Sequence, residues 1–189
     1  MLNTVDRCRG CFVGLFCGDA LGQLVEFAAP GTFEPITGYR AGGPHNLEKG
    51  QFTDDGSMAL ALADSLKHGW DLNDQAERYC QWLEEGKYSV NGWCFDIGAT
   101  TRQALERFME CKDATKSGLT EPSASGNGGI MRIAPVAIRY HNFEEHPKGT
   151  MLSYSWESLV PMLYSLGSQS SSVTHASEMC NTLLANEGL

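Results

Sequence analysis

The sequence predicts an all-α domain, and three observations carry this prediction. Alternation of apolar and polar residues with a period of two is almost absent along the 189 residues. Apolar side chains recur instead at helical spacing, as at Ala104, Leu105, Phe108 and Met109. Glycine and proline gather between these runs, most densely in residues 28–50. We therefore expect a single helical domain over residues 1–189.

The first expected helix covers about residues 5–24 and contains a glycine at every fourth position. Gly10, Gly14, Gly18 and Gly22 lie close to one helix face, and each costs roughly 1 kcal/mol relative to alanine. We expect another backbone to approach this face closely as compensation. Charged side chains inside the segment argue against membrane insertion, and no apolar stretch approaches the length of a membrane span.

The remaining elements follow from the same spacing. Further helices are expected at about residues 55–68, 74–85, 97–111, 155–166 and 174–185. The segment "IMRIAPVAIRY" is expected to hold a helix that Pro135 starts, ends or kinks. Residues 28–50 read as a long irregular loop, and loops of that length in compact domains are often functional.

Composition and charge exclude several classes of function. The net charge of −9 argues against a nucleic-acid binder, although it leaves room for a single phosphorylated ligand. The seven cysteines are irregularly spaced and the N-terminus lacks a secretory signal, so we expect a reduced, cytoplasmic setting. The single CxxC, Cys8 to Cys11, favours two small apolar residues on adjacent helical turns over a zinc site.

The acidic triplet Thr53, Asp54 and Asp55 stands directly before a run of good helix formers. Such residues at a helix start accept hydrogen bonds from backbone N–H groups and complement the helix dipole. A hydroxyl and two carboxylates crowded together also suit a hard divalent cation. The residues alone leave both interpretations open.

Three other candidates each have a simpler alternative. Glu26 follows the glycine-rich helix, where most glutamates are solvated or cap a helix. Asp96 and Gly98 precede an expected helix, and capping explains such an aspartate equally well. His175 lies near an expected helix start, where a single histidine is usually structural or faces solvent.

A serine- and glycine-rich stretch, "SASGNGGIMR", is expected to lead directly into an apolar helix. Five of the seven residues at 123–129 are Ser or Gly, which lets backbone N–H groups approach an anion. The stretch does not match the phosphate-binding patterns of nucleoside triphosphate or dinucleotide sites. A flexible loop without a ligand remains the alternative.

Taken in order, five stretches resemble the ADP-ribosylglycohydrolase family: "GCFVGLFCGDALGQLVEF", "FTDDGSMALALADSL", "FDIGATTRQALERF", "SGNGGIMRIAPVAI" and "VTH". The similarity is closest to the bacterial branch that includes the dinitrogenase-reductase-activating glycohydrolases, and it covers essentially the whole chain. It implies an all-α fold around two Mg²⁺ or Mn²⁺ ions. It also implies cleavage of the glycosidic bond between ADP-ribose and an acceptor, such as an arginine side chain of a protein. No nucleic-acid or membrane partner is expected.

The resemblance implies a role for each candidate. Thr53, Asp54 and Asp55 resemble the first group of metal ligands, so that the triplet is ligand and cap together. The expected catalytic residues are Glu26, Asp55 and Asp96, with Asp96 and Gly98 also near the substrate ribose or the leaving guanidinium. The remaining substrate contacts are expected from Ser125, Gly126, Asn127, Gly128, Gly129, Met131 and His175. The first of these form a phosphate-binding loop, and His175 contacts the distal part of ADP-ribose.

Two departures from the family pattern stand out. Gly56 occupies a position where many relatives have threonine. Family members also carry a second Asp-x-Asp-[Thr/Ser] motif that completes the metal site, whereas no aspartate follows Asp113 here. We therefore expect the domain to be incomplete at its C-terminus, with the remaining ligands on a missing segment or a second chain. The alternative is a catalytically inactive module that binds ADP-ribose or a partner.

Overall fold

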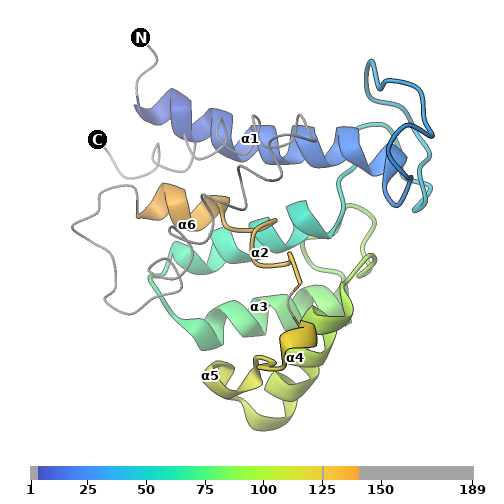
Figure 1. Ribbon diagram of the computed structural model, residues 1–189. Coiled ribbons are helices and arrows are strands. Elements are labelled where there is room, and N and C mark those ends of the chain that lie inside the picture. Colours follow the sequence, from blue (N-terminus) through green and yellow to red (C-terminus); the bar gives the residue numbers. More distant parts are fainter. Residues whose placement is uncertain (1–3, 125, 141–189) are drawn as a thin grey trace.

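The computed structural model describes residues 4–124 and 126–140, and this part of the chain is helical (Figure 1). The elements are α1 (Thr4–Gly22), η1 (Gln23–Val25), α2 (Asp54–Leu66), α3 (Leu72–Glu85), α4 (Ala99–Cys111), α5 (Ala114–Ser117), η2 (Pro122–Ala124) and α6 (Ala134–Arg139), where η marks a short 3-10 turn. No strand occurs in this part; one isolated antiparallel bridge joins Gly42 and Leu47. The all-α prediction is confirmed here. The helices expected at 155–166 and 174–185, with His175, lie outside the described residues.

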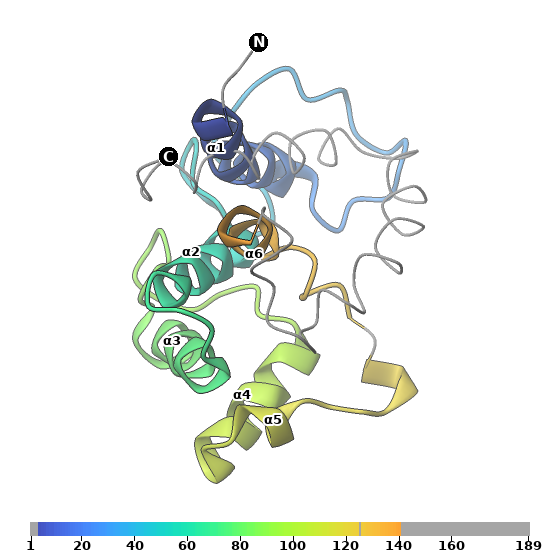
Figure 2. The ribbon, with the colours of Figure 1, turned by 90° about the vertical axis from the view of Figure 1, so that its left-hand side faces the viewer.

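Helix α2 lies at the centre of the described helices (Figures 1 and 2). It packs against α3 on one side and against α1 and α6 on the other, while α4 and α5 cover α3. The start of α2 therefore lies close to the end of α1 and to the connection from α3 to α4. This arrangement positions the candidate site.

Two clusters of buried side chains hold the helices together. The larger cluster joins α2, α3, α4 and α6 around Met58 and Trp82, whose side chains are fully buried. The smaller joins α1 to α6, and in it Cys8 and Cys11 pack against Ile138. The prediction that the CxxC places two small apolar side chains on one helix is confirmed.

Helix boundaries are set by residues with specific capping roles. Helix α3 begins at Leu72, two residues before the predicted start, because the Asp71 carboxylate accepts hydrogen bonds from the N–H groups of Asn73 and Asp74. It ends at Glu85, and Gly86 after it adopts the left-handed conformation. Pro135 lies in the first turn of α6, so this proline starts the helix.

The segment Thr4–Val25, formed by α1 and η1, has the length and apolar composition of a membrane span. The expectation that no stretch approaches such a span is wrong by this criterion. The criterion is weak evidence, because core helices of soluble proteins satisfy it too, and α1 contacts α2 and α6. The glycine face is not closely approached along its whole length. Gly14 is buried, but a Cβ at Gly22 would meet no atom within 4 Å.

Candidate active site

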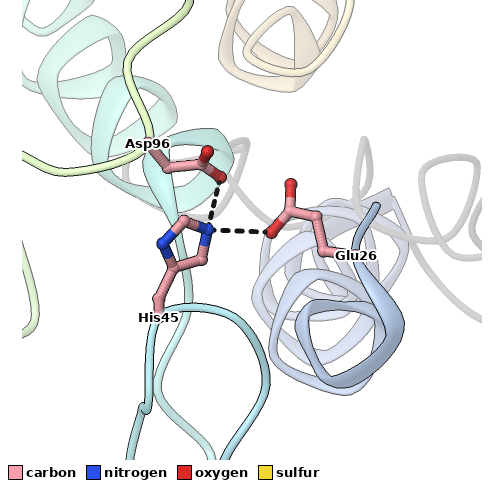
Figure 3. A group of neighbouring side chains, drawn as sticks. All are labelled: Glu26, His45 and Asp96. Atoms are coloured by element: carbon pink, nitrogen blue, oxygen red, sulfur yellow. Dashed lines mark ion pairs between the residues drawn. The ribbon is translucent and has the colours of Figure 1, made fainter. Parts of the chain in front are cut away.

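Acidic side chains and one histidine from four segments gather around the start of α2. Glu26 follows η1, His45 lies in the long loop, Asp55 lies in the first turn of α2, and Asp96 precedes α4. In Figure 3 the imidazole of His45 points between the carboxylates of Glu26 and Asp96. His45 Nε2 lies 3.3 Å from Glu26 Oε2 and 3.2 Å from Asp96 Oδ2. The connection from η1 to α2 and the connection from α3 to α4 thus meet at one nitrogen atom.

Two of these atoms are buried without a hydrogen-bond partner in the described part of the chain. They are Glu26 Oε2 and His45 Nε2, which are in ion-pair contact but do not satisfy hydrogen-bond geometry. One ligand atom each from Glu26, His45 and Asp96 lies within 4.8 Å of the other two. A buried polar atom without a partner is costly, so a ligand that these atoms could share would stabilise them.

The backbone around Asp96 turns sharply to place its side chain. Asp96 has a φ of 59°, in the left-handed region that aspartate tolerates better than most residues. The N-cap of α4 is Gly98, and no side chain caps that helix start. Capping was the alternative explanation for Asp96, and it is wrong: the carboxylate contacts His45 instead.

The start of α2 is capped from a distant helix. Thr53 occupies the N-cap position, but its hydroxyl makes no capping bond. It donates instead to Asp19 Oδ1 at 2.8 Å, and the N–H groups of Thr53 and Gly56 donate to Asp19 Oδ2 at 3.0 Å. The expectation that Thr53 caps the helix is therefore wrong, because Asp19 on α1 provides the cap, while the expectation that Thr53 is a metal ligand stays a prediction.

Burial and mutual repulsion raise the pKa values of the acidic side chains at this site. Desolvation is the larger cause, followed by neighbouring carboxylates, and together they raise the pKa of Glu26 to about 8. The pKa of Asp54 rises to about 8, from burial and then the charge of Asp55. The pKa of Asp55 rises to about 7, from burial and then Asp19. Glu26, Asp54 and Asp55 are thus close enough to resist simultaneous ionisation.

The donor set fits a hard divalent cation. Within residues 4–124 and 126–140, no lysine or arginine forms an ion pair with Asp19, Glu26, Asp54, Asp55 or Asp96. In this part of the chain, therefore, no lysine or arginine neutralises the acidic side chains. Carboxylate and hydroxyl oxygens are the ligands that Mg²⁺ and Mn²⁺ prefer in proteins.

The serine- and glycine-rich loop lies against the first turn of α4. A Cβ at Gly128 would come within 3.1 Å of Thr101 Oγ1, and one at Gly126 within 3.8 Å of Thr100 Oγ1. The prediction that the loop leads directly into a helix is wrong, because residues 128–132 form turns and α6 begins only at Ala134. A phosphate would therefore meet loop N–H groups and not the start of that helix.

The other predicted substrate contacts have mixed outcomes. Met131 packs against the larger core cluster, so its side chain is at least partly occupied in holding the fold. Gly98 is exposed, and a Cβ there would meet no atom within 4 Å, which leaves open space beside Asp96. Ser125 and His175 lie outside the described residues. Their roles stay predictions.

Two residues of the site were not predicted as functional from the sequence. Asp19 is an acidic residue inside an apolar, glycine-rich helix, and that unusual placement was the available signal. His45 lies in the long loop whose length already indicated a function. Neither residue type in isolation identifies a site, so the contacts had to come from the fold.

Comparisons with known proteins identify the family of this chain. The family model for ADP-ribosylglycohydrolase matches residues 1–185. The chain is 40% identical, over 97% of its length, to "ADP-ribosylarginine hydrolase Tri1" of Pseudomonas putida, covering 46% of that protein. It is 36% identical, over 70% of its length, to "ADP-ribosyl-[dinitrogen reductase] glycohydrolase" of Rhodospirillum rubrum, covering 44% of it.

A solved structure shares the fold as well. It is described as "ADP-ribosylglycohydrolase-related protein complex" and superposes with a TM-score of 0.63 at 35% identity, over 94% of this chain and 50% of that one. The chain spans about half the length of the relatives it matches. The match of the family model over nearly all of the sequence decides the classification: this chain belongs to the ADP-ribosylglycohydrolase family.

Proposed function

We propose that the protein to which this chain belongs is a metal-dependent hydrolase that removes ADP-ribose from arginine side chains of proteins. The observation that carries the proposal is the gathering of acidic side chains from α1, α2 and the connections beside them around the start of α2. Relatives from Pseudomonas putida and Serratia proteamaculans are named ADP-ribosylarginine hydrolases, which supports arginine as the acceptor.

The spacing of Glu26 and Asp96 suits a cationic leaving group. Both carboxylates lie within 3.3 Å of one nitrogen atom, His45 Nε2, so they are close enough together to act on the same leaving group. The guanidinium of a modified arginine presents planar N–H donors that pair well with carboxylates. In this proposal Asp96 binds the guanidinium, and the open space beside Gly98 admits the arginine side chain.

The hydrolysis needs one proton transfer in each direction. Glu26 accepts a proton from water as the water oxygen bonds to C1″ of the ribose. The bond between C1″ and the guanidino nitrogen breaks, and Glu26 returns the proton to that nitrogen. Arginine leaves as the guanidinium ion, free ADP-ribose is released, and Glu26 is again a carboxylate. As the bond breaks, C1″ passes through an oxocarbenium-like transition state, which is common to glycoside cleavage in general.

Thr53, Asp54 and Asp55 are the residues that would hold Mg²⁺ or Mn²⁺, because they offer only oxygen donors at one helix start. When bound, such a cation would orient the ribose hydroxyls and so position C1″ for the attacking water. We assign the pyrophosphate to residues 125–129 and the distal part of ADP-ribose to His175.

The test is release of ADP-ribose from a protein carrying ADP-ribosylarginine. We expect the full-length protein to release ADP-ribose with Mn²⁺ or Mg²⁺ present and not with EDTA. Asp55→Ala should lower the rate by about 10³-fold, which corresponds to several kcal/mol of lost stabilisation. The matched control is Asp64→Asn, at the other end of α2, which should keep the rate.

ADP-ribose binding in EDTA, without hydrolysis under any divalent cation, would contradict the enzyme proposal. That result would favour a binding module instead. Equal losses of the hydrolysis rate in Asp55→Ala and Asp64→Asn would contradict a special role for the start of α2.

A further inference from the structure

Asp19 is the residue on which the geometry of the predicted metal ligands converges. Its Oδ1 atom accepts from the Thr53 hydroxyl at 2.8 Å, and its Oδ2 atom accepts from the N–H groups of Thr53 and Gly56 at 3.0 Å. These bonds span 34 to 37 residues of sequence and join α1 to the first turn of α2. Asp54 and Asp55 lie between the two bonded residues, so the backbone that carries them is held from both sides.

The bond from the Thr53 hydroxyl has a consequence for the chemistry of that oxygen. A hydroxyl has one hydrogen and two lone pairs. Because the hydrogen is directed to Asp19 Oδ1, the side of Thr53 Oγ1 that faces away from Asp19 presents lone pairs. A hydroxyl can bind a cation only through lone pairs, so this bond prepares Thr53 as a ligand before any ion arrives.

Packing around Asp19 keeps the helix start in register. The rings of Phe16, one turn earlier on α1, and Phe52, just before Thr53, meet edge to face with centroids 4.9 Å apart. A Cβ at Gly56 would lie 2.4 Å from the Phe52 ring and 2.9 Å from the Phe16 ring, so a side chain there would force these rings to move. The Ser57 hydroxyl donates to the Thr53 carbonyl at 2.9 Å. The first turn of α2 is thus fixed against α1 by apolar and polar contacts together.

We propose that Asp19 is a positioning residue for the metal site: it orients the Thr53 hydroxyl and the first turn of α2 so that their oxygens face the cation. Asp19 acts through Thr53 and does not itself touch the ion. This inference rests on the proposed metal-dependent function. Partners of metal ligands that are held in this way commonly contribute 10- to 100-fold to metal affinity.

The experiment measures the dissociation constant for Mn²⁺ directly, by the electron paramagnetic resonance signal of the free ion, in the full-length protein without substrate. We expect Asp19→Ala to raise the dissociation constant by about 10- to 100-fold. Asp19→Asn keeps one acceptor oxygen for the Thr53 hydroxyl, so it should recover part of the affinity. The matched control is Asp71→Ala, which removes the capping carboxylate of α3 and should leave Mn²⁺ affinity unchanged.

A double-mutant cycle separates positioning from general destabilisation. Thr53→Val removes the hydroxyl but keeps the backbone N–H that donates to Asp19. If Asp19 acts partly through that hydroxyl, Asp19→Asn should lower Mn²⁺ affinity by a smaller factor in the Thr53→Val background than in the wild type. Because Asp19→Asn and Thr53→Val change little volume, the cycle stands even if Asp19→Ala does not fold.

Three results would overturn the proposal. An unchanged dissociation constant in Asp19→Asn and Asp19→Ala would overturn the role of Asp19 alone and leave the metal-dependent function intact. Additive losses in the cycle would show that Asp19 acts on stability and not through Thr53. Absence of Mn²⁺ binding by the wild-type protein would overturn the metal-dependent function and the role of Asp19 together.

Discussion

Helix α2 carries aspartates at both ends, and the two ends surround them differently. In the first turn, burial and the charge of Asp55 raise the pKa of Asp54 to about 8. Near the last turn, the pKa of Asp64 is lowered to about 2. A hydrogen bond from Lys67 is the largest cause, and Arg78 adds a salt bridge.

The difference lies in what neutralises the charge. Arg78 also donates to Asp74 at 2.8 Å, and the Tyr88 hydroxyl donates to Asp64 at 2.8 Å, so the far end is a closed network of the chain's own groups. At the start of α2, the described residues provide no lysine or arginine partner. Like charges held together without a counter-ion reduce stability, and proteins retain such arrangements at functional sites. The comparison thus separates a structural cluster from the candidate functional one.

The largest expected effect comes from removing a proton acceptor at the start of α2. Glu26→Gln has almost the same size but cannot accept a proton, so kcat should fall by about 10²- to 10⁴-fold. The measurement is steady-state hydrolysis of an ADP-ribosylarginine protein. Asp74→Asn removes a carboxylate from the Arg78 network and should keep kcat within about twofold. Similar losses in both variants would erase the distinction between the two ends.

Adding a divalent cation should stabilise the protein through the start of α2 and not through the end of that helix. At a free Mn²⁺ concentration of 100 times the dissociation constant, the expected gain is about 2.7 kcal/mol, or roughly 5–10 °C in Tm. Thermal unfolding with and without EDTA measures this shift. Arg78→Gln should show the same shift from a lower starting Tm, whereas Asp54→Asn should lose most of it. A shift of full size in Asp54→Asn would place the ion elsewhere.

Breaking the Arg78 network near the end of α2 should lower the stability of the protein and leave the proposed metal site unaffected. The Arg78 side chain is 15% exposed and bonds to Asp64, Asp74 and Tyr88. We expect Arg78→Met to lower the free energy of unfolding by about 2 kcal/mol, measured by urea denaturation, because it leaves carboxylates without their partner. The Lys67 side chain is 64% exposed, so Lys67→Met should lower the free energy of unfolding by about 0.5 kcal/mol or less. Equal costs would mean that burial does not matter here.

The smallest expected effect is the loss of the stability contribution of Asp64 at low pH. The pKa of Asp64 is lower in the folded chain than its ordinary value of 3.8, so its contribution to stability is present above about pH 4. That contribution is lost as the pH falls toward 2. The stability difference between wild type and Asp64→Asn should therefore shrink over this range, by on the order of 1 kcal/mol because the carboxylate is partly exposed. A constant difference from pH 4 to pH 2 would contradict the lowered pKa.

Much of the site could be predicted because its residues lie at or near the ends of helices, which the sequence pattern indicates. Thr53, Asp54 and Asp55 stand at a helix start, and Glu26 and Asp96 flank helices. The local pattern could not show that the triplet does not cap its own helix, since the carboxylate that accepts from the N–H groups of Thr53 and Gly56 belongs to Asp19, 34 residues before Thr53 in the sequence. The glycine at position 56 had no explanation until Phe16 and Phe52 were seen to fill the space beside it.

By itself the sequence determined the helical class, the approximate helix bounds in the described part and the family, because helical spacing, capping residues and ordered motifs are local properties. The tertiary structure alone decided that Asp19 caps α2 and that His45 lies between Glu26 and Asp96. It also decided that the serine- and glycine-rich loop lies against α4. These contacts join residues far apart in the chain, and their geometry follows from how the helices pack, which no local pattern records.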